Sequence, residues 1–385
     1  MARLGRMLTL GLRYLVCGSW WHDARAVRLY RWLEPVDVLL FCTSPVDEQW
    51  LRTTFRECRR RGMRCASALV AMGGPPLAEP ERFDVRVSPL GLRRLAARVV
   101  VTSSSGVPRW VMPRSARHCV HMPHSLVSLH MVYPDGAFDG YDAFFCCGEH
   151  HVREVARLDE LAGRPPRACY RVGYGKMDLM RRRRAEPDAA GAGGKTDRPT
   201  VLLAPSWGPG SILETIGEPL VAALLDAQFG VVVRPHPLVV AERGDLLEAI
   251  ARRAAAGDAL AIESPSDEPR AMHSAAVMIS DYSGAAFEYA FLRERPVVFV
   301  DVPLKEVNPA WRRLGLEPME VALRRRVGTV VAPKVDAVVD AVRRLLAEGD
   351  ARAEAIRDVR SEAVFNWDDC AGAAADAIGR LLGSA

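Results

Sequence analysis

The sequence VVVRPHP at residues 231–237 and the sequence VMISDYSG at residues 277–284 decide the fold. In each of them a short apolar run, of the length of a buried strand, ends at polar side chains and is followed by a helical pattern. Repeated strand–turn–helix units are typical of a parallel sheet covered by helices. Ligands of such sheets bind outside the carboxyl ends of the strands. We therefore expect the two turns to converge on a phosphorylated ligand.

The same alternation of strand and helix extends over the rest of the chain. Apolar runs typical of strands occupy residues 36–42, 65–72, 99–102, 119–122, 143–147, 201–204, 231–233, 260–262, 277–279 and 297–300. Helical patterns occupy residues 48–61, 90–98, 149–161, 214–228, 238–256 and 285–292, and three more lie between residue 336 and the end. The alternation predicts an α/β protein with parallel sheets.

The stretch 181–199, RRRRAEPDAAGAGGKTDRP, interrupts this alternation. It has no apolar periodicity and is rich in charged residues, Gly, Ala and Pro, which is typical of a linker. A chain of 385 residues is long enough for two separate cores. We predict two Rossmann-like domains facing a cleft, residues 1–180 and residues 200–385. The C-terminal helices close the second domain, and residues 181–199 form the linker.

The composition is that of a folded, globular chain with an excess of arginine. Hydrophobic residues make up 49% and charged residues 26%, which excludes extended disorder. The net charge is +5, and only four of the 52 basic residues are lysines. This excess is explained either by coding bias or by attraction to an anionic membrane surface or polyanionic polymer. No nucleic-acid motif accompanies the basic residues, so we expect no nucleic-acid partner.

Residues 7–21, MLTLGLRYLVCGSWW, are apolar but form no convincing signal peptide or membrane span. Arg13 interrupts the run, which is shorter than the roughly 20 residues that cross a bilayer. The segment fits a helix at a membrane surface and equally a first helix packed on the protein. We expect a cytoplasmic protein, with peripheral attachment to the inner face of the cell membrane as an open alternative.

Arg234 and His236 are the first candidates for binding or catalysis. They directly follow residues 231–233, and Pro235 and Pro237 restrict the backbone around them. An arginine fork suits phosphate oxygens, and a histidine can donate a hydrogen bond or a proton to a leaving phosphate. An ordinary surface turn can contain the same residues, so the motif gains weight only beside a second one.

The second candidate motif contains Ser280, Asp281, Ser283 and Gly284. Ser or Asp at the start of a helix caps it, and the free N–H groups and the helix dipole form an anion site. Glycine lets a ligand approach the backbone closely. Glu288 lies one helical turn further on, where it can accept hydrogen bonds from a hydroxylated group. An ordinary helix cap is the alternative interpretation.

A third polar strand end in the second half contains Ser206 and Trp207, which follow residues 201–204. Their loop also contains two glycines, and it suits either a phosphate or a plain turn. Three polar strand ends in one half of the chain favour a nucleotide-donor site there.

His124 and Ser125 follow a predicted strand of the first half, residues 119–122. Histidine takes and gives protons near neutral pH, so His124 is a candidate general base toward a hydroxyl group. Other histidines lie nearby, but their spacing on a loop lacks the helical context and the carboxylate of a zinc site. The chain also has no Asp-x-Asp pair to hold a metal–diphosphate complex. We expect no metal and no other cofactor.

Together these motifs resemble the CDP-glycerol glycerophosphotransferase family, whose members build teichoic-acid and related phosphodiester-linked polymers. The resemblance covers roughly residues 118–300, and its matching segments are 124–125, 173–178, 205–207, 234–237 and 281–288. The sequence departs from the family pattern at five positions: Pro123 replaces Trp, Ser125 replaces Gly, Lys176 replaces Arg, Gly284 replaces Ser and Glu288 replaces Asp.

The resemblance implies a GT-B fold, with the acceptor side in the first domain and the nucleotide donor in the second. It implies a transferase that moves a glycerol-phosphate-like (polyol phosphate) group from a CDP-alcohol to a polymer or lipid-linked hydroxyl acceptor and releases CMP. Teichoic-acid synthesis for the cell wall, or capsule polysaccharide synthesis, would be the setting.

The resemblance also implies a role for each candidate residue. His124 would deprotonate the acceptor hydroxyl, and His236, Arg234 and Lys176 would stabilise charge on the diphosphate and the departing CMP. Ser283 and Gly284 would hold phosphate oxygens, and Glu288 would hold the polyol. The remaining donor-side candidates are Ser125, Ser206, Trp207, Ser280 and Asp281.

Three other functions remain open. A GT-B glycosyltransferase that uses a nucleotide sugar would share the architecture and the base but would release a nucleoside diphosphate. A nucleotide-sugar 2-epimerase would need no acceptor. A non-catalytic protein that binds nucleotide precursors would bind nucleotide without turnover.

Overall fold

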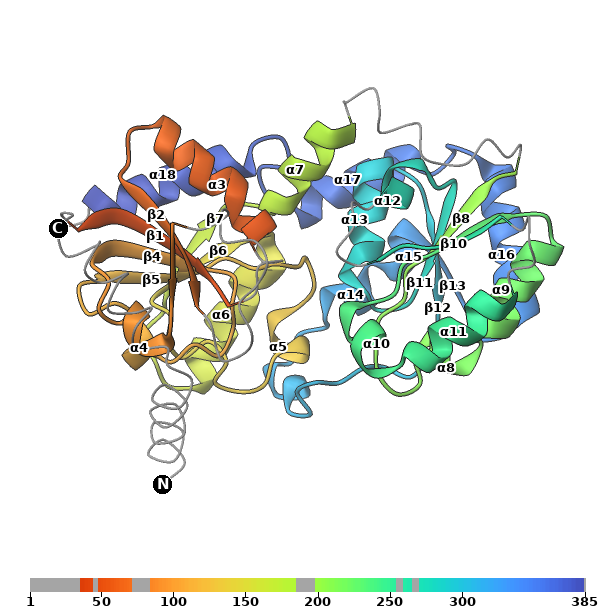
Figure 1. Cartoon of the computed structure of the whole chain (residues 1–385), viewed down its shortest axis with the longest axis horizontal. Helices are drawn as coiled ribbons and strands as arrows, with labels where there is room; N and C mark the ends of the chain where they lie inside the picture. The colour runs from red at the N-terminus through yellow and green to blue at the C-terminus, as the bar shows by residue number, and fades with distance from the viewer. Residues whose placement is uncertain are drawn as a thin grey trace. The chain divides into compact units, whose positions relative to one another are not determined.

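The computed structural model describes residues 35–43, 48–70, 84–184, 198–253, 259–264 and 270–383 (Figure 1). The chain divides into two compact units. Unit 1 contains residues 1–124, 133–178 and 365–385, and unit 2 contains residues 125–132 and 179–364. The apolar N-terminal stretch 7–21 lies outside the described residues.

Unit 1 is built on a seven-stranded parallel sheet in the order β3-β2-β1-β4-β5-β6-β7. Its strands are β1 (Val36–Cys42), β2 (Cys65–Val70), β3 (Val85–Val87), β4 (Ala97–Thr102), β5 (His118–His121), β6 (Ala143–Cys146) and β7 (Ala168–Arg171). The central strands are apolar and buried because helices cover the sheet, as parallel sheets require.

The helices of unit 1 come from both ends of the chain. They are α3 (Glu48–Arg60), α4 (Pro89–Leu92), the 3-10 turn η3 (Arg109–Val111), α6 (Glu149–Leu161), the start of α7 (Gly175–Arg184) and α18 (Cys370–Gly383). Helices α3 and α18 pack against each other, and α18 also packs on β4 (Figure 1). Ile378 and Leu381 of α18 belong to the same core as β1, β4, β5 and β6.

Unit 2 is built on a six-stranded parallel sheet in the order β10-β9-β8-β11-β12-β13. Its strands are β8 (Thr200–Leu203), β9 (Gly230–Val233), β10 (Leu260–Ile262), β11 (Val277–Ser280), β12 (Val297–Val300) and β13 (Gly328–Val331). Chain order runs outward from β8 on one side and from β11 on the other. The crevice for a ligand is therefore expected at the carboxyl ends of β8 and β11, where the strand order reverses.

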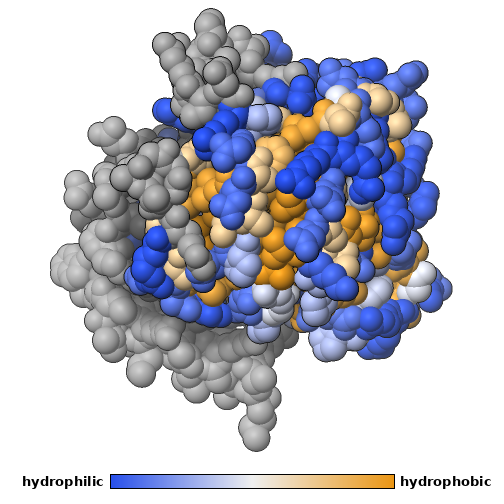
Figure 2. Space-filling model, turned by 90° about the vertical axis from the view of Figure 1, so that its right-hand side faces the viewer, coloured by the Kyte–Doolittle hydropathy of each residue, from blue (hydrophilic) through white to orange (hydrophobic). Residues whose placement is uncertain are grey.

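The helices of unit 2 pack on this sheet or on one another. They are α5 (Leu129–Val132), α8 (Ile212–Thr215), α9 (Gly217–Asp226), α10 (Pro237–Glu242), α11 (Gly244–Arg253), α12 (Arg270–Ser274), α13 (Gly284–Arg293), η5 (Trp311–Leu314), α14 (Met319–Ala322), α15 (Arg324–Val327), α16 (Val335–Glu348) and α17 (Ala353–Ala363). In α16 the buried Val338, Val342 and Leu345 recur at helical spacing. On the face shown in Figure 2, hydrophobic residues form a central area bordered by hydrophilic ones.

The prediction of two Rossmann-like α/β domains is confirmed, and several element bounds are corrected. Residues 90–98 do not form a helix, because α4 ends at Leu92 and the β-branched run from Val99 to Val101 pairs with β1 and β5 instead. The predicted helix 214–228 is divided at Ile216 into α8 and α9, and the predicted helix 238–256 is divided at Arg243 into α10 and α11. Strands β3, β7 and β13 are short, and sequence patterns do not reveal them.

The predicted division at residues 181–199 is also corrected at three places. Helix α7 continues through Arg184, so the run of four arginines is helical rather than the start of a linker. Helix α18 belongs to unit 1 and not to the second domain, because its apolar face completes the core over β1 and β4. None of the helices that the structure describes is long and apolar enough to cross a bilayer.

The third correction concerns residues 125–132, which belong to unit 2. The Ser128 hydroxyl donates to Oε1 of the buried Glu320 at 2.8 Å, and the Ser128 N–H donates to Oε2 at 2.9 Å. Nδ2 of Asn308 donates to the His130 carbonyl at 3.0 Å. These buried hydrogen bonds fix the segment on unit 2, because leaving any of their groups unpaired would cost free energy.

We expect Asp178→Ala to lower the free energy of unfolding by about 1–3 kcal/mol, because the buried Asp178 carboxylate accepts the N–H groups of Cys370 and Ala371 at the start of α18. Denaturant unfolding measures the difference. The matched control is Asp376→Ala on the exposed face of the same helix, where the ion pair with Arg61 should contribute less than about 1 kcal/mol. Equal effects of the two substitutions would contradict the assigned cap.

Candidate functional site

A buried carboxylate joins two strand ends where the strand order of unit 2 reverses. Asp281 follows β11 and is fully buried. Its two oxygens accept the N–H and the hydroxyl of Ser206, both at 2.9 Å, and Ser206 lies in the loop after β8. Burial raises the pKa of Asp281, and the hydrogen bonds from Ser206 oppose that shift. Nearby, the Ser280 hydroxyl donates to the Ala204 carbonyl at 2.6 Å, so it also holds β8 to β11.

Helix α13 begins directly beside this carboxylate. Ser283 caps the helix, and its side chain accepts the Ala285 N–H at 3.3 Å. The dipole and the first N–H groups of this ten-residue helix favour an anion. Glu288 lies one turn further on and is buried, with 4% of its surface exposed.

Gly284, the first residue of α13, lies against the segment 125–132. A Cβ atom at Gly284 would lie 2.5 Å from the Ser125 hydroxyl oxygen and 3.4 Å from Val127. These distances leave no room for a side chain at position 284 while Ser125 keeps its place. Both residues belong to unit 2, so the contact is internal to the unit.

His236 caps α10, the helix that follows β9. Its Nδ1 accepts the Leu238 N–H at 3.2 Å, so the neutral ring carries its proton on Nε2. Burial, and then the positive charge of Lys305, lower the pKa of His236 to about 4. At neutral pH His236 is therefore a neutral hydrogen-bond donor rather than an acid.

Arg234, which precedes His236 by two residues, forms an ion pair within unit 2. Its Nη1 lies 3.0 Å from Oε2 of Glu263, and each side chain is 17% exposed. The other oxygen of Glu263 accepts the Ala271 N–H at the start of α12. The guanidinium is thus held at the ends of β9 and β10 by a carboxylate that is itself fixed.

Lys305 is a charged residue of this region that the sequence motifs do not single out. It follows β12, and its Nζ lies 3.0 Å from the centroid of the Trp207 ring. The Trp207 ring in turn lies 5.8 Å from the His236 ring. Burial lowers the pKa of Lys305 to about 8, and the charge of Asp281 opposes that shift. Polar residues that follow neighbouring parallel strands lie at the same edge of the sheet. Applied to the predicted strand 297–300, this rule would have found Lys305.

His124 and Lys176 belong to unit 1. The Nδ1 of His124 lies 3.2 Å from the Ser103 carbonyl, which can only accept, so Nδ1 carries the proton of the neutral ring. Nε2 is then the basic nitrogen, with the Tyr133 hydroxyl 3.4 Å away. This orientation suits a general base. Lys176 lies in the first turn of α7 and is partly buried.

His121 packs in the core of unit 1. It is fully buried, its ring contacts the rings of Phe138, Tyr141 and Phe144, and burial lowers its pKa to about 3. Among the residues that the structure describes, no group of three His, Cys, Asp or Glu side chains is placed to hold a metal ion. The expectation of metal-independent chemistry therefore stays a prediction.

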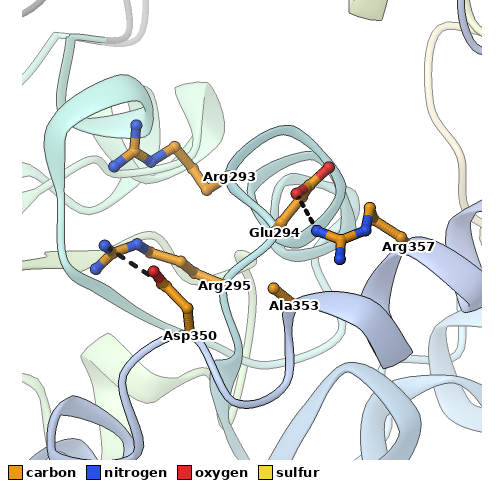
Figure 3. A pocket seen from close by; sticks show the side chains of 6 residues that line it. All are labelled: Arg293, Glu294, Arg295, Asp350, Ala353 and Arg357. Atoms are coloured by element: carbon orange, nitrogen blue, oxygen red, sulfur yellow. Dashed lines mark hydrogen bonds and ion pairs between the residues drawn. The ribbon is translucent and has the colours of Figure 1, made fainter.

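A cavity of about 460 Å³ lies elsewhere in unit 2 (Figure 3). It is lined by Arg293, Glu294, Arg295, Asp350, Ala353 and Arg357. Arg295 pairs with Asp350 at 3.6 Å and Arg357 with Glu294 at 2.7 Å (Figure 3). The cavity adjoins the C-terminal end of α13, where the helix dipole is unfavourable for an anion. It is separate from the residues that the sequence singles out.

The pKa of His236 predicts a pH-dependent difference in stability. The folded protein holds this ring neutral down to about pH 4, whereas the unfolded chain protonates it near pH 6.5, so the contribution is lost as pH falls between these values. From pH 6.5 to pH 4.5 the wild type should lose about 2 kcal/mol more unfolding free energy than His236→Asn, which keeps a cap acceptor. Denaturant unfolding at both pH values tests this, with His118→Asn as the control. Parallel pH curves for wild type and His236→Asn would contradict it.

The contact between Ser125 and Gly284 predicts a compensating pair of substitutions. Gly284→Ala should displace the Ser125 hydroxyl and lower the unfolding free energy by about 1–2 kcal/mol. Combining it with Ser125→Gly removes the obstructing hydroxyl, so the double variant should lose less than the sum of the single variants. Denaturant unfolding of the four proteins measures the coupling. Additive losses would show that the two positions do not compete for the same space.

Comparisons with known proteins agree with this architecture. A family model described as CDP-glycerol:poly(glycerophosphate) glycerophosphotransferase matches residues 167–382. The wall teichoic acid polymerase TagF has a similar structure, with a TM-score of 0.62 and 12% sequence identity over 98% of each chain. The UDP-GlcNAc 2-epimerase of Neisseria meningitidis bound to UDP-GlcNAc gives a TM-score of 0.58 at 12% identity, over 91% of this chain and 100% of the epimerase chain.

The UDP-GlcNAc 2-epimerase of Methanocaldococcus jannaschii in complex with UDP-GlcNAc and UDP is a third structural neighbour, with a TM-score of 0.55 and 11% identity over 84% of this chain and 97% of that one. A search of curated protein sequences finds no match. At these identities the structural similarities establish the fold, which is of the GT-B type, and the family model establishes the family. Since that match spans more than half of the sequence, the chain belongs to the CDP-glycerol:poly(glycerophosphate) glycerophosphotransferase family.

Proposed function

We propose that the protein transfers a polyol-phosphate group, such as glycerol phosphate, from a CDP-alcohol to a hydroxyl group of a growing cell-envelope polymer or its lipid-linked primer. The observation that carries the proposal is the set of strand ends after β8, β9, β11 and β12, which gathers a capped helix start, a neutral histidine and an ammonium group within unit 2. Family membership supports the donor class, and TagF has been studied with CDPG.

In the proposed reaction an acceptor oxygen attacks the phosphorus atom that bears the polyol. A new phosphorus–oxygen bond forms, and the bond between that phosphorus and the bridging oxygen breaks. The electron pair stays on the phosphate of CMP, which leaves. His124 takes the acceptor proton at Nε2, because the Ser103 carbonyl holds the proton of the neutral ring on Nδ1.

The residues of unit 2 bind the donor in this proposal. The N–H groups at the start of α13, with Ser283 and Gly284, hold phosphate oxygens, and Nε2–H of the neutral His236 donates to another. Trp207 offers an aromatic face at the same edge, and Arg234 adds positive charge. Asp281 holds Ser206 by two hydrogen bonds and Ser280 donates to the Ala204 carbonyl, so these residues fix the loop after β8 that carries Trp207.

Three further roles complete the proposal. Ser125 lies at the start of α13 beside the phosphate site, Glu288 accepts hydrogen bonds from the hydroxyl groups of the polyol, and Lys176 balances negative charge on the diphosphate. Catalysis of this kind depends mainly on positioning and electrostatic stabilisation. We propose that it needs no metal ion.

A nucleotide-sugar reaction is the second candidate, because the fold is shared with UDP-GlcNAc 2-epimerases. A glycosyltransferase would release a nucleoside diphosphate, and an epimerase would invert a sugar centre without an acceptor. The nucleotide product separates these functions from the proposed one directly.

We expect purified protein to release CMP from CDP-glycerol or CDP-ribitol in the presence of a polyol-phosphate polymer acceptor, with and without EDTA. His124→Ala removes the base and should lower the rate by about 10²- to 10⁴-fold. His236→Ala should also lower it, because it removes a donor to the phosphate. His118→Ala, at the start of β5, serves as the matched control.

Chromatography of the nucleotides measures the outcome. Full activity in both His124→Ala and His236→Ala would contradict the assigned roles, and a diphosphate product would contradict the reaction. Loss of activity in EDTA that Mg²⁺ restores would contradict metal independence.

A further inference from the structure

Lys305 is an unusual cation in this protein. The chain has four lysines and therefore 48 arginines among its 52 basic residues, and many of the arginines lie beside carboxylates. Lys305 instead places its ammonium group over an indole, with Nζ 3.0 Å from the centroid of the Trp207 ring. Within the described parts of the chain, Asp281 attracts it electrostatically, but no carboxylate forms an ion pair with it.

The surroundings of Lys305 come from the ends of four neighbouring strands. Trp207 and Gly208 follow β8, His236 follows β9, Asp281 follows β11, and Lys305 itself follows β12. The Cε atom of Lys305 lies 3.9 Å from where a Cβ of Gly208 would be, so a glycine faces the lysine stem. The ammonium therefore sits at the edge of the sheet where an open parallel α/β fold binds its ligand.

The other polar groups at this edge have partners within the protein or are uncharged. Arg234 is paired with Glu263, and burial keeps His236 neutral at neutral pH. Asp281 accepts two hydrogen bonds from Ser206 and is fully buried beneath the loop. Lys305 is partly buried, and an ammonium in that position is stabilised when an anion binds beside it.

We propose that Lys305 is a donor-contacting residue whose ammonium group binds the phosphate of the cytidine nucleotide, with the Trp207 ring as its support. The identity of the anion rests on the proposed function. As the bond to the departing CMP breaks, negative charge grows on the CMP phosphate, and the fixed positive charge of Lys305 stabilises it. Lys305 keeps its proton throughout, so no proton has to be supplied or removed.

Titration calorimetry with cytidine, CMP and CDP-glycerol separates a contact to phosphate from a purely structural role. Lys305→Gln should weaken CMP binding by about tenfold or more and leave cytidine binding unchanged, because only the phosphate contact is lost. Lys305→Arg, which keeps the charge, should stay within a few-fold of the wild type. Lys334→Gln removes the same charge from an exposed lysine before α16 and should change neither affinity.

The affinity of the wild type for CMP should also fall as pH rises through about 8, since Lys305 loses its charge there, and Lys305→Arg should remove this step. The groups that face Lys305 are Trp207, His236 and Asp281; His236 stays neutral at these pH values, and the Lys305→Arg variant, which keeps Asp281 and His236 in place, isolates the contribution of Lys305 itself. Equal weakening of cytidine and CMP in Lys305→Gln, or no weakening of either, would overturn the proposal.

These experiments distinguish a failure of the Lys305 proposal from a failure of the proposed reaction. If the wild type binds CMP through Lys305 but releases no CMP from CDP-glycerol, the reaction is wrong and the phosphate contact stands. If transfer occurs and Lys305→Gln leaves both CMP binding and kcat/KM unchanged, the role of Lys305 is wrong. If the wild type shows no saturable binding of CMP, CDP-glycerol or inorganic pyrophosphate, the proposed role of Lys305 is also wrong.

Discussion

The carboxylate of Asp281 determines the geometry of the candidate site. It is fully buried at the end of β11, and both of its oxygens accept hydrogen bonds from Ser206 in the loop after β8. A buried carboxylate that lost these donors would carry a large desolvation cost, so the loop has one favoured position. Trp207 follows Ser206 directly, and the same two hydrogen bonds therefore set where its ring meets His236 and Lys305.

Burial also decides which of the nearby groups are charged. The pKa of His236 falls because the ring is buried next to a cation, whereas burial raises the pKa of Asp281 and the hydrogen bonds from Ser206 oppose that rise. The result at neutral pH is an uncharged N–H donor, an ammonium group and a capped helix start on one edge of a parallel sheet. This combination favours a ligand with negative charge and several acceptor oxygens.

Much of the fold could be predicted from the sequence because its central strands are continuous apolar runs. Residues 36–42 and 297–300 match β1 and β12, and residues 149–161 match α6. Short peripheral strands such as β13, which begins at Gly328, lack such a run. The unit to which α18 belongs could not be predicted, because the sequence of residues 370–383 shows an apolar face but not which sheet that face covers.

The candidate site was predictable in its location and less so in its interactions. Strand ends give the place of Ser206, His236 and Asp281, but the ion pair of Arg234 joins residues 29 positions apart and depends on strand order. Ser125 and Gly284 are two of the positions at which the sequence departs from the family pattern. Their contact shows why the two departures fit together, since a hydroxyl at one position occupies the space of a side chain at the other.

The assignment of α18 to unit 1 has a consequence for the order in which the protein is made. A ribosome completes residues 125–132 and 179–364, and so all of unit 2, before it adds residues 365–385. Until then the core of unit 1 lacks the side chains of Ile378 and Leu381, and its apolar surface over β1 and β4 stays uncovered. During synthesis unit 1 is therefore completed after unit 2, and until α18 is made its sheet leaves apolar surface uncovered that can aggregate.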